Sequence, residues 1–187
     1  MKKLLLIGAT DPNGAGLQAD WRVCSQLGIS ACTVVTSVTA QNHDRVHRTG
    51  ILPAEQIRAQ LQSIDWSTIA AIKVGMLGNA VVIRTLLPFL DQDIPLVLDP
   101  VLSASSGGVL LDAEGRQEMI NNLLPRSDLI TPNLTEGFEL TKTPESNSTQ
   151  GEPIARQLCE LGANAVLLTG ADHDPSHNWS GDYFYTD

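Results

Sequence analysis

Short apolar segments alternate regularly with segments of helical periodicity along this chain, and this alternation is the strongest constraint on its fold. Strands are expected at residues 3–8, 31–40, 69–75, 96–99, 128–131 and 165–169. Helices are expected at residues 15–27, 53–65, 79–90, 112–124, 134–141 and 153–161. The first helix should bury one face, formed by Leu17, Trp21, Cys24 and Leu27. This order of elements predicts an α/β protein with a mostly parallel sheet.

Length and charge limit the classes of function. A chain of 187 residues predicts one domain, residues 1–187, with a core that needs no disulfides. The net charge is −9 and no basic cluster occurs, so nucleic acid is not an expected partner. The 3 cysteines are odd in number and widely spaced, which favours a reducing compartment. No stretch is long enough to span a bilayer, so we expect a cytoplasmic protein without a membrane partner.

Polar and glycine-rich residues follow the predicted strands, at the points where the strands end. They include Thr10-Asp11, Gln41-Asn42, Gly75-Met76, Asp99-Pro100, Thr131-Pro132-Asn133 and Thr169-Gly170. Ligands of parallel α/β sheets bind beyond the carboxyl ends of the strands, so we expect a binding site at this edge. The Gly- and Ser-rich stretch at residues 103–108 could cover such a site as a lid.

The turn between the first predicted strand and helix carries the most informative pattern. Residues 8–20 read Gly-Ala-Thr-Asp-Pro-Asn-Gly-Ala-Gly-Leu-Gln-Ala-Asp. Such a turn exposes backbone N–H groups at a helix N-terminus, where a polar or anionic group can bind. Asp-Pro and Asn-Gly also form turns in any protein, so a purely connecting role stays open. The pattern is neither Gly-x-Gly-x-x-Gly nor a Walker loop, so the nucleotide fingerprints do not apply.

Three further strand ends carry residues that suit a small polar ligand, and each also has a purely structural explanation. Gln41 offers an amide that can read a heteroaromatic ring, or it can simply belong to a turn. Met76 beside Gly75 can pack against a flat ring or fill the core. Asp99 can serve a metal or phosphate, or it can hydrogen-bond the next loop.

Two interpretations also fit the segment around Asn133. Asn133 can be the N-cap of the next helix, with Glu136 completing a capping box. Glu136 can instead organise Mg²⁺, through water, beside phosphates. The position of the segment at the ligand edge of the sheet favours the second interpretation.

Taken together, these segments resemble the phosphomethylpyrimidine kinase family of thiamine biosynthesis, within the ribokinase-like superfamily. The matching segments occur in family order and spacing: residues 10–20, Ala40-Gln41-Asn42, Lys73-Val74-Gly75-Met76-Leu77, Asp99-Pro100-Val101 and residues 129–136. The resemblance implies a ribokinase-like three-layer sandwich. It also implies an ATP- and Mg²⁺-dependent kinase acting on 4-amino-5-hydroxymethyl-2-methylpyrimidine and then on its monophosphate, and a homodimer.

The resemblance also assigns the substrate site by position. Asp20 and Gln41 would hydrogen-bond the aminopyrimidine, Met76 and Val101 would flank its ring, and Ala9 would line the same site. Groups that donate, accept and stack at one sheet edge suit a flat polar ring.

The remaining assignments concern the phosphates. Asp99 and Glu136 would serve the metal and phosphate region, and Asn133 and Thr169 would bind the nucleotide. Phosphoryl transfer mainly requires positioning and charge stabilisation, which fits this donor set.

The chain departs from the family pattern at several places. The turn at residues 11–16 is one Gly shorter than usual. Ala9 stands where Gly is usual, Thr169 where a phosphate-binding Lys is common, and Ala171 where a second Gly is usual. The Gly-Thr-Gly-Cys segment that supplies the family's anion hole is absent before Asp187, so the catalytic group stays unassigned. We therefore expect a kinase fold whose C-terminal part is missing, and weak or no kinase activity for the 187-residue chain itself.

Two alternatives stay open beside the pyrimidine kinase. One is a pyridoxal kinase of the same superfamily, which has a similar site. The other is a non-catalytic protein that binds the pyrimidine without phosphorylating it.

Overall fold

The computed structural model describes residues 2–42, 44–90, 93–104, 108–144, 151–174 and 179–186. The middle of the stretch expected as a lid, residues 105–107, lies outside the described residues. None of the helices that the structure describes combines the length and the apolarity needed to cross a membrane.

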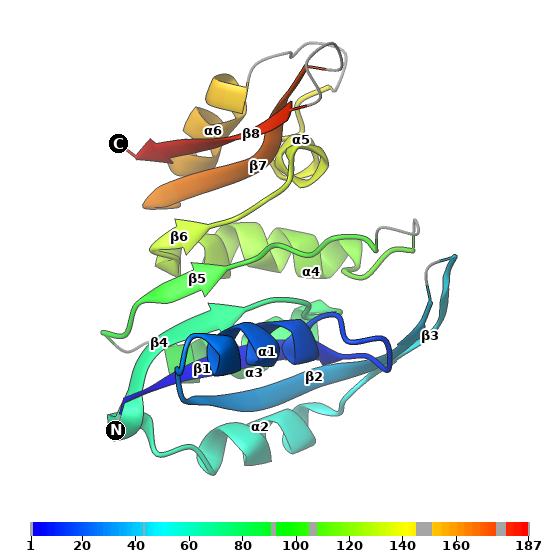
Figure 1. Ribbon diagram of the computed structural model, residues 1–187, viewed down its shortest axis with the longest axis vertical. Helices are drawn as coiled ribbons and strands as arrows, with labels where there is room; N and C mark the ends of the chain where they lie inside the picture. The colour runs from blue at the N-terminus through cyan, green and yellow to red at the C-terminus, as the bar shows by residue number, and fades with distance from the viewer. Residues whose placement is uncertain are drawn as a thin grey trace.

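One eight-stranded sheet organises the molecule (Figure 1). Its strands are β1 (Lys3–Thr10), β2 (Ala31–Gln41), β3 (Val46–Ile51), β4 (Ile69–Val74), β5 (Leu96–Leu98), β6 (Leu129–Ile130), β7 (Ala165–Asp174) and β8 (Trp179–Thr186). The spatial order is β3-β2-β1-β4-β5-β6-β7-β8. Only the outer pairs β2–β3 and β7–β8 are antiparallel. The expected mostly parallel α/β sheet is therefore confirmed.

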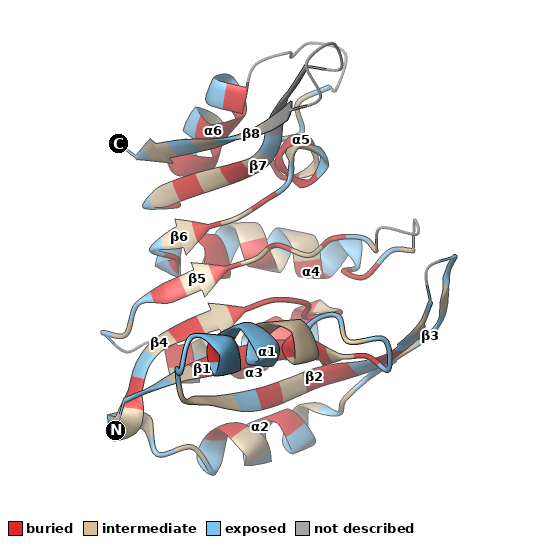
Figure 2. Cartoon of the chain, in the orientation of Figure 1, coloured by how far each residue is buried: buried red, intermediate tan, exposed pale blue. Residues whose placement is uncertain are grey.

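Helices cover both faces of the sheet. They are α1 (Leu17–Gln26), α2 (Ala54–Gln62), α3 (Ala80–Leu90), α4 (Ala113–Glu118), α5 (Leu134–Thr141) and α6 (Gly151–Glu160). The main core joins α2, α3, α5 and α6 to one face, and Leu5, Ile7 and Val74 of the sheet are fully buried in it. On the opposite face, α1 packs Leu17 and Cys24 over β1 (Figure 2). The result is the three-layer arrangement that the resemblance implied.

The expected apolar face of α1 is wrong in part. Leu17 and Cys24 are buried, but Trp21 and Leu27 are 48% and 67% exposed. The helix covers only the β1–β2 part of the sheet and ends at Gln26, so its buried strip is narrow. Trp21 instead lines an open groove beside the turn that precedes the helix.

Two other departures have simple physical reasons. Strand β3 was not expected, because its side chains are mostly exposed and carry no apolar pattern. The single helix expected at residues 112–124 is α4 followed by a π-helical turn, Met119–Leu123, and a 3₁₀ turn, Leu124–Arg126. Leu123 and Leu124 are both buried, and this change of helical pitch turns neighbouring leucines into the core.

Candidate active site

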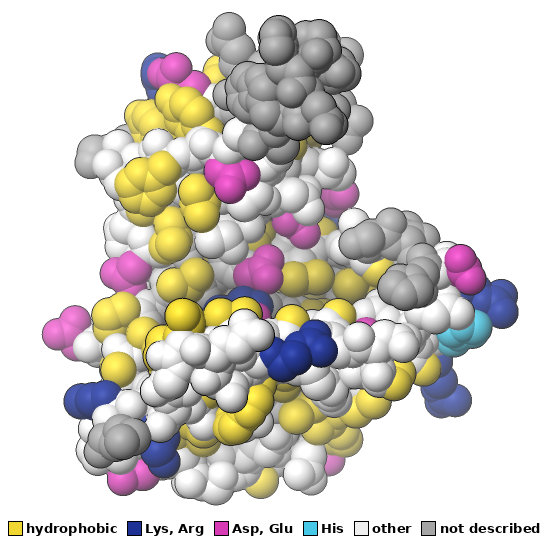
Figure 3. All heavy atoms as spheres, in the orientation of Figure 1, with side chains coloured by type: hydrophobic (Ala, Val, Ile, Leu, Met, Phe, Trp, Pro, Cys, Tyr) yellow, Lys and Arg dark blue, Asp and Glu magenta, His cyan; other side chains and the backbone are white. Residues whose placement is uncertain are grey.

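A cavity of about 530 Å³ opens at the carboxyl edge of the central strands. The lining comes from the ends of β1, β2, β4 and β5 and from the start of α1. On the surface, acidic and apolar side chains gather on the hollowed face beside α1 (Figure 3). This volume falls within the range of small-molecule sites.

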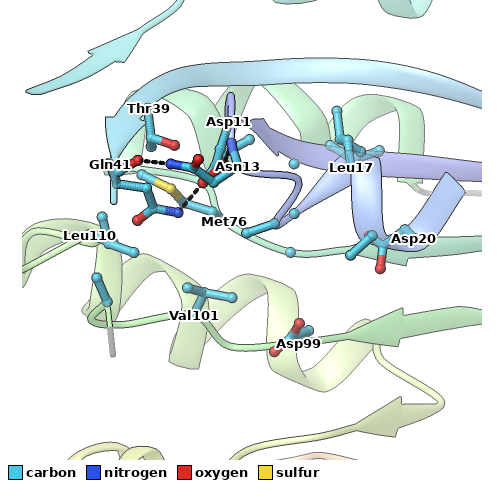
Figure 4. A pocket seen from close by; sticks show the side chains of 18 of the residues that line it. Asp11, Asn13, Leu17, Asp20, Thr39, Gln41, Met76, Asp99, Val101 and Leu110 are labelled. Atoms are coloured by element: carbon cyan, nitrogen blue, oxygen red, sulfur yellow. Dashed lines mark hydrogen bonds between the residues drawn. The ribbon is translucent and has the colours of Figure 1, made fainter. Parts of the chain in front are cut away.

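All of the predicted substrate-binding residues line this one cavity. Ala9 lies in β1, Asp20 in α1 and Gln41 at the end of β2, whereas Met76 and Val101 follow β4 and β5. Figure 4 shows Gln41 at one end of the cavity, Asp20 toward the other, and Met76 and Val101 between them. The fold thus brings together residues that are up to 92 positions apart (Ala9 to Val101), and their binding role stays a prediction.

Lys73 is a residue of the cavity to which the sequence assigned no role. Its Nζ lies 3.0 Å from Asp20 Oδ2 and 3.2 Å from Asp99 Oδ2. Burial alone lowers the pKa of the ammonium, but the two carboxylates outweigh it, so the pKa of Lys73 is raised. Among the described residues that line the cavity, Lys73 is the only cation. It therefore ties the predicted substrate carboxylate to the predicted phosphate-region carboxylate.

Asp11 and Asn13 fix the orientation of Gln41. The side-chain Nε2 of Gln41 donates to Asp11 Oδ2, and Asn13 Nδ2 donates to the backbone carbonyl oxygen of Gln41 (Figure 4). Asp11 also accepts from the Asn13 backbone N–H, and it is only 4% exposed. Because a carboxylate only accepts, the amide nitrogen of Gln41 must face Asp11, and its Oε1 stays available as an acceptor.

Gly16 closes the turn against β1. Its φ is +58°, and a Cβ there would lie 2.4 Å from the Ala9 carbonyl oxygen. Gly16 also forms a bridge with Thr10. Only glycine combines this backbone conformation with so close an approach to the neighbouring strand. Gly16 therefore sets where α1 begins, and with it the position of Asp20.

The predicted nucleotide residues do not line the cavity. Asn133 follows β6, whereas Thr169 lies within β7, which continues to Asp174 instead of ending at residue 169 as expected. Asn133 caps α5 and forms a capping box with Glu136, so the capping interpretation is confirmed, whereas the nucleotide-binding role of Asn133 stays a prediction. Asn133 and Thr169 form a bridge, and the Thr169 N–H donates to Pro132 O at 2.9 Å. This pairing places Asn133, just after β6, beside Thr169 within β7.

Glu136 is held mainly by backbone amides. Its Oε2 accepts from Asn133 N at 2.9 Å, and its Oε1 faces Leu102 N at 3.5 Å. Its pKa is raised, first by burial and also by the charge of Asp99, although the Asn133 N–H acts in the opposite direction. The repulsion between the two carboxylates means that a cation between them would be favoured.

The metal prediction can be tested against this donor set. Within the described part of the chain, no three His, Cys, Asp or Glu side chains form a group suited to a metal ion. Mg²⁺ commonly keeps several waters and uses one or two carboxylates with phosphate oxygens. Asp99 and Glu136 fit a cation held in that way, and they do not form an all-protein cage.

Comparisons with known proteins point to one family. The family model described as phosphomethylpyrimidine kinase matches residues 11–187. The hydroxymethylpyrimidine/phosphomethylpyrimidine kinase of Haemophilus influenzae is 37% identical over 176 residues, which cover 91% of this chain. The chain spans 65% of the length of that relative.

Solved structures agree in fold. The phosphomethylpyrimidine kinase of Clostridium difficile 630 superposes with a TM-score of 0.86 at 29% identity. The superposition covers all of this chain and 81% of the Clostridium difficile chain. The pyridoxal kinase of Staphylococcus aureus in complex with pyridoxal gives a TM-score of 0.84 at 27% identity, covering 100% and 68%. The fold is therefore shared with a phosphomethylpyrimidine kinase and with a pyridoxal kinase.

Proposed function

The chain belongs to the phosphomethylpyrimidine kinase family, and from this premise we propose a kinase of thiamine biosynthesis. In this proposal, the whole protein transfers phosphate from ATP to 4-amino-5-hydroxymethyl-2-methylpyrimidine and then to its monophosphate. We also expect it to be a cytoplasmic homodimer.

The observation that carries this proposal is the composition of the cavity. A flat polar ring with N–H and O–H donors is bound by hydrogen-bond acceptors and apolar walls. One cavity offers an amide acceptor from Gln41, a carboxylate from Asp20, and apolar walls from Met76 and Val101. Gln41 Oε1 accepts from the exocyclic amine of the ring, because Asp11 holds its amide nitrogen. Asp20 accepts from a second donor of the substrate, an amine N–H or the hydroxyl, while Lys73 holds its carboxylate in place.

The hydroxymethyl group would point toward Asp99. Lys73 joins Asp99 to Asp20, so a substrate held by Asp20 has its reacting end near the phosphate region. Mg²⁺, carried by Asp99 and Glu136 through water, would neutralise charge on the phosphates. Asn133 and Thr169, which lie side by side after β6 and within β7, would bind the phosphates of ATP.

A second candidate, pyridoxal kinase, is favoured by the close superposition with the Staphylococcus aureus enzyme. Both substrates are hydroxymethyl heteroaromatic rings, and they differ in the donors and acceptors that they present. Gln41 with Asp11 favours the aminopyrimidine, because a fixed amide acceptor matches an exocyclic amine.

Calorimetric titration of both ligands separates the candidates. We expect the aminopyrimidine to bind at least tenfold more tightly than pyridoxal, a difference of about 1.4 kcal/mol. Gln41→Leu should weaken pyrimidine binding about tenfold, since it removes the acceptor. Gln62→Leu, at an exposed position of α2, serves as the control and should change nothing.

Coupled release of ADP tests catalysis apart from binding. Release of ADP that depends on the pyrimidine supports the kinase. Tight binding of the pyrimidine without release of ADP from the intact protein would instead indicate a non-catalytic binding protein. Preferential binding and phosphorylation of pyridoxal would refute the pyrimidine assignment.

A further inference from the structure

Strand β2 carries an irregularity next to the cavity. Gly8 of β1 lies opposite Val35 of β2. The next residue of β1, Ala9, lies opposite Ser37, so Thr36 is one extra residue in β2. An insertion of this kind is a β-bulge, and bulges near sites redirect the side chains that follow.

The burial pattern of β2 shows this redirection. Before the bulge, the buried side chains stand at even positions, Val34 and Thr36. After it, they stand at odd positions, Ser37 and Thr39. A strand with an unbroken period of two would keep the even positions on the buried face and turn Gln41 to the opposite one. The extra residue therefore decides that Thr39 and Gln41 line the cavity.

The two bulge residues also hold Met76. Thr36 Oγ1 donates to the Met76 carbonyl oxygen at 2.6 Å, and Ser37 Oγ donates to Met76 Sδ at 3.7 Å. Thr36 and Ser37 are both 0% exposed, so these hydroxyls have no water to replace a lost partner. Met76 in turn packs with Ala9 and Leu110 at the cavity wall.

We propose that Thr36 and Ser37 are positioning residues for substrate recognition: the bulge aims Gln41, and the two hydroxyls fix Met76 against the ring. Neither residue lines the cavity itself. The inference rests on the proposed function, because it needs Gln41 and Met76 to contact the pyrimidine.

Binding of 4-amino-5-hydroxymethyl-2-methylpyrimidine to the full chain, followed by calorimetry, tests the proposal. Thr36→Val keeps the shape but loses the hydroxyl, and should raise Kd about tenfold. Thr36→Ser keeps the hydroxyl and should bind within about twofold of the parent protein, whereas Ser37→Ala should raise Kd about threefold.

A matched control separates positioning from general loss of stability. Ser127 is also 0% exposed, and its hydroxyl donates to the Leu123 carbonyl at 3.0 Å, away from the cavity. Ser127→Ala should lower the thermal midpoint and leave Kd unchanged. If Thr36→Val and Ser37→Ala affect Kd no more than Ser127→Ala does, the proposal is overturned. If Thr36→Val does not fold, the comparison of Ser37→Ala with Ser127→Ala decides.

Methionine methyl NMR gives a readout that needs no ligand. Met76 and Met119 are the two described methionines, and Met119 lies in the main core as an internal reference. Thr36→Val and Ser37→Ala should shift or broaden the Met76 methyl signal and leave that of Met119 in place. An unchanged Met76 signal overturns the proposal. Failure of the parent protein to bind the pyrimidine refutes the proposed function and, with it, a role for these residues in recognition.

Discussion

Replacing Lys73 with methionine removes the one cation between two carboxylates and should measurably destabilise the fold. The side chain keeps its length, so packing changes little and the loss is electrostatic. The side chains of Lys73, Asp20 and Asp99 are 26%, 25% and 34% exposed, so the cluster is only partly shielded from water. After substitution, the two half-buried carboxylates face each other without a counter-charge.

The size of the effect follows from the geometry. At about 3 Å and an effective dielectric constant of about 20, each contact has a Coulomb energy of about 5 kcal/mol before desolvation is subtracted. Exposed ion pairs contribute about 0.2–1 kcal/mol in measurements, and breaking buried ones costs about 3–5 kcal/mol. A partly exposed pair should lie between these limits, so we expect a loss of about 2 kcal/mol, or about 4–8 °C in thermal midpoint.

Urea unfolding followed by circular dichroism measures this loss, with Arg84→Met as the control. Arg84 also bridges two carboxylates, Glu114 and Glu118, at 2.7 and 2.9 Å, but the cation itself is 50% exposed and Glu114 is 68% exposed, while Glu118 is 14% exposed. The Arg84 variant should therefore lose much less stability. Equal losses in the two variants would refute the argument that partial burial strengthens the Lys73 cluster.

The pH dependence supplies a second check. Because the pKa of Lys73 is raised in the folded state, its contribution is complete below the unfolded pKa of about 10.4 and disappears as pH rises through the folded value. The stability difference between the parent protein and Lys73→Met should thus stay constant from neutral pH up to about pH 9 and shrink only above about pH 10. A difference that disappears near neutral pH would contradict the assignment.

Two further predictions concern the turn and the buried carboxylate. Gly16→Ala places a Cβ 2.4 Å from the Ala9 carbonyl and should cost at least about 2 kcal/mol in urea unfolding. Gly28→Ala has a similar φ of +68° but meets nothing within 4 Å, so it should cost only about 1 kcal/mol, and equal losses would contradict the close approach at Gly16. The raised pKa of Glu136 means that its protonated form is favoured by folding, so that contribution is complete below the unfolded pKa of about 4.3 and is lost as pH rises through the folded value. As pH rises from about 4 to about 7, the stability of Glu136→Gln should therefore increase relative to that of the parent protein. Urea midpoints of the two proteins that change equally with pH would contradict this prediction.

The fold was predictable because its strands are of the kind that sequence reveals best. Parallel strands covered on both faces are nearly continuous apolar runs, so β1 and β4 stand out from their surroundings even though β4 includes Lys73. The edge strand β3 shows the opposite case. It pairs with β2 but exposes most of its side chains, so no apolar pattern marked it in advance.

The candidate site was predictable in its members but not in its connections. The rule that ligands meet strand ends selected Gln41, Met76 and Asp99 without knowledge of any contact. The role of Lys73 was not predicted, because its partners Asp20 and Asp99 are 53 and 26 positions away in the sequence. A signal was nevertheless present: a single charge inside a buried strand is costly unless it is paired.

The bulge in β2 shows why the members of a site do not determine its geometry. An unbroken period of two would have placed Gln41 on the wrong face, although the strand-end rule had already selected it. The extra residue, Thr36, shifts the side-chain alternation so that Gln41 faces the cavity. Its hydroxyl also donates a hydrogen bond to the Met76 carbonyl oxygen. Consecutive small hydroxyl residues within an apolar strand are therefore a sequence signal for a change of the buried face. Each buried hydroxyl needs a hydrogen-bond partner. A bulge lets two neighbouring residues turn toward the same side of the sheet, so both can bond to one partner residue.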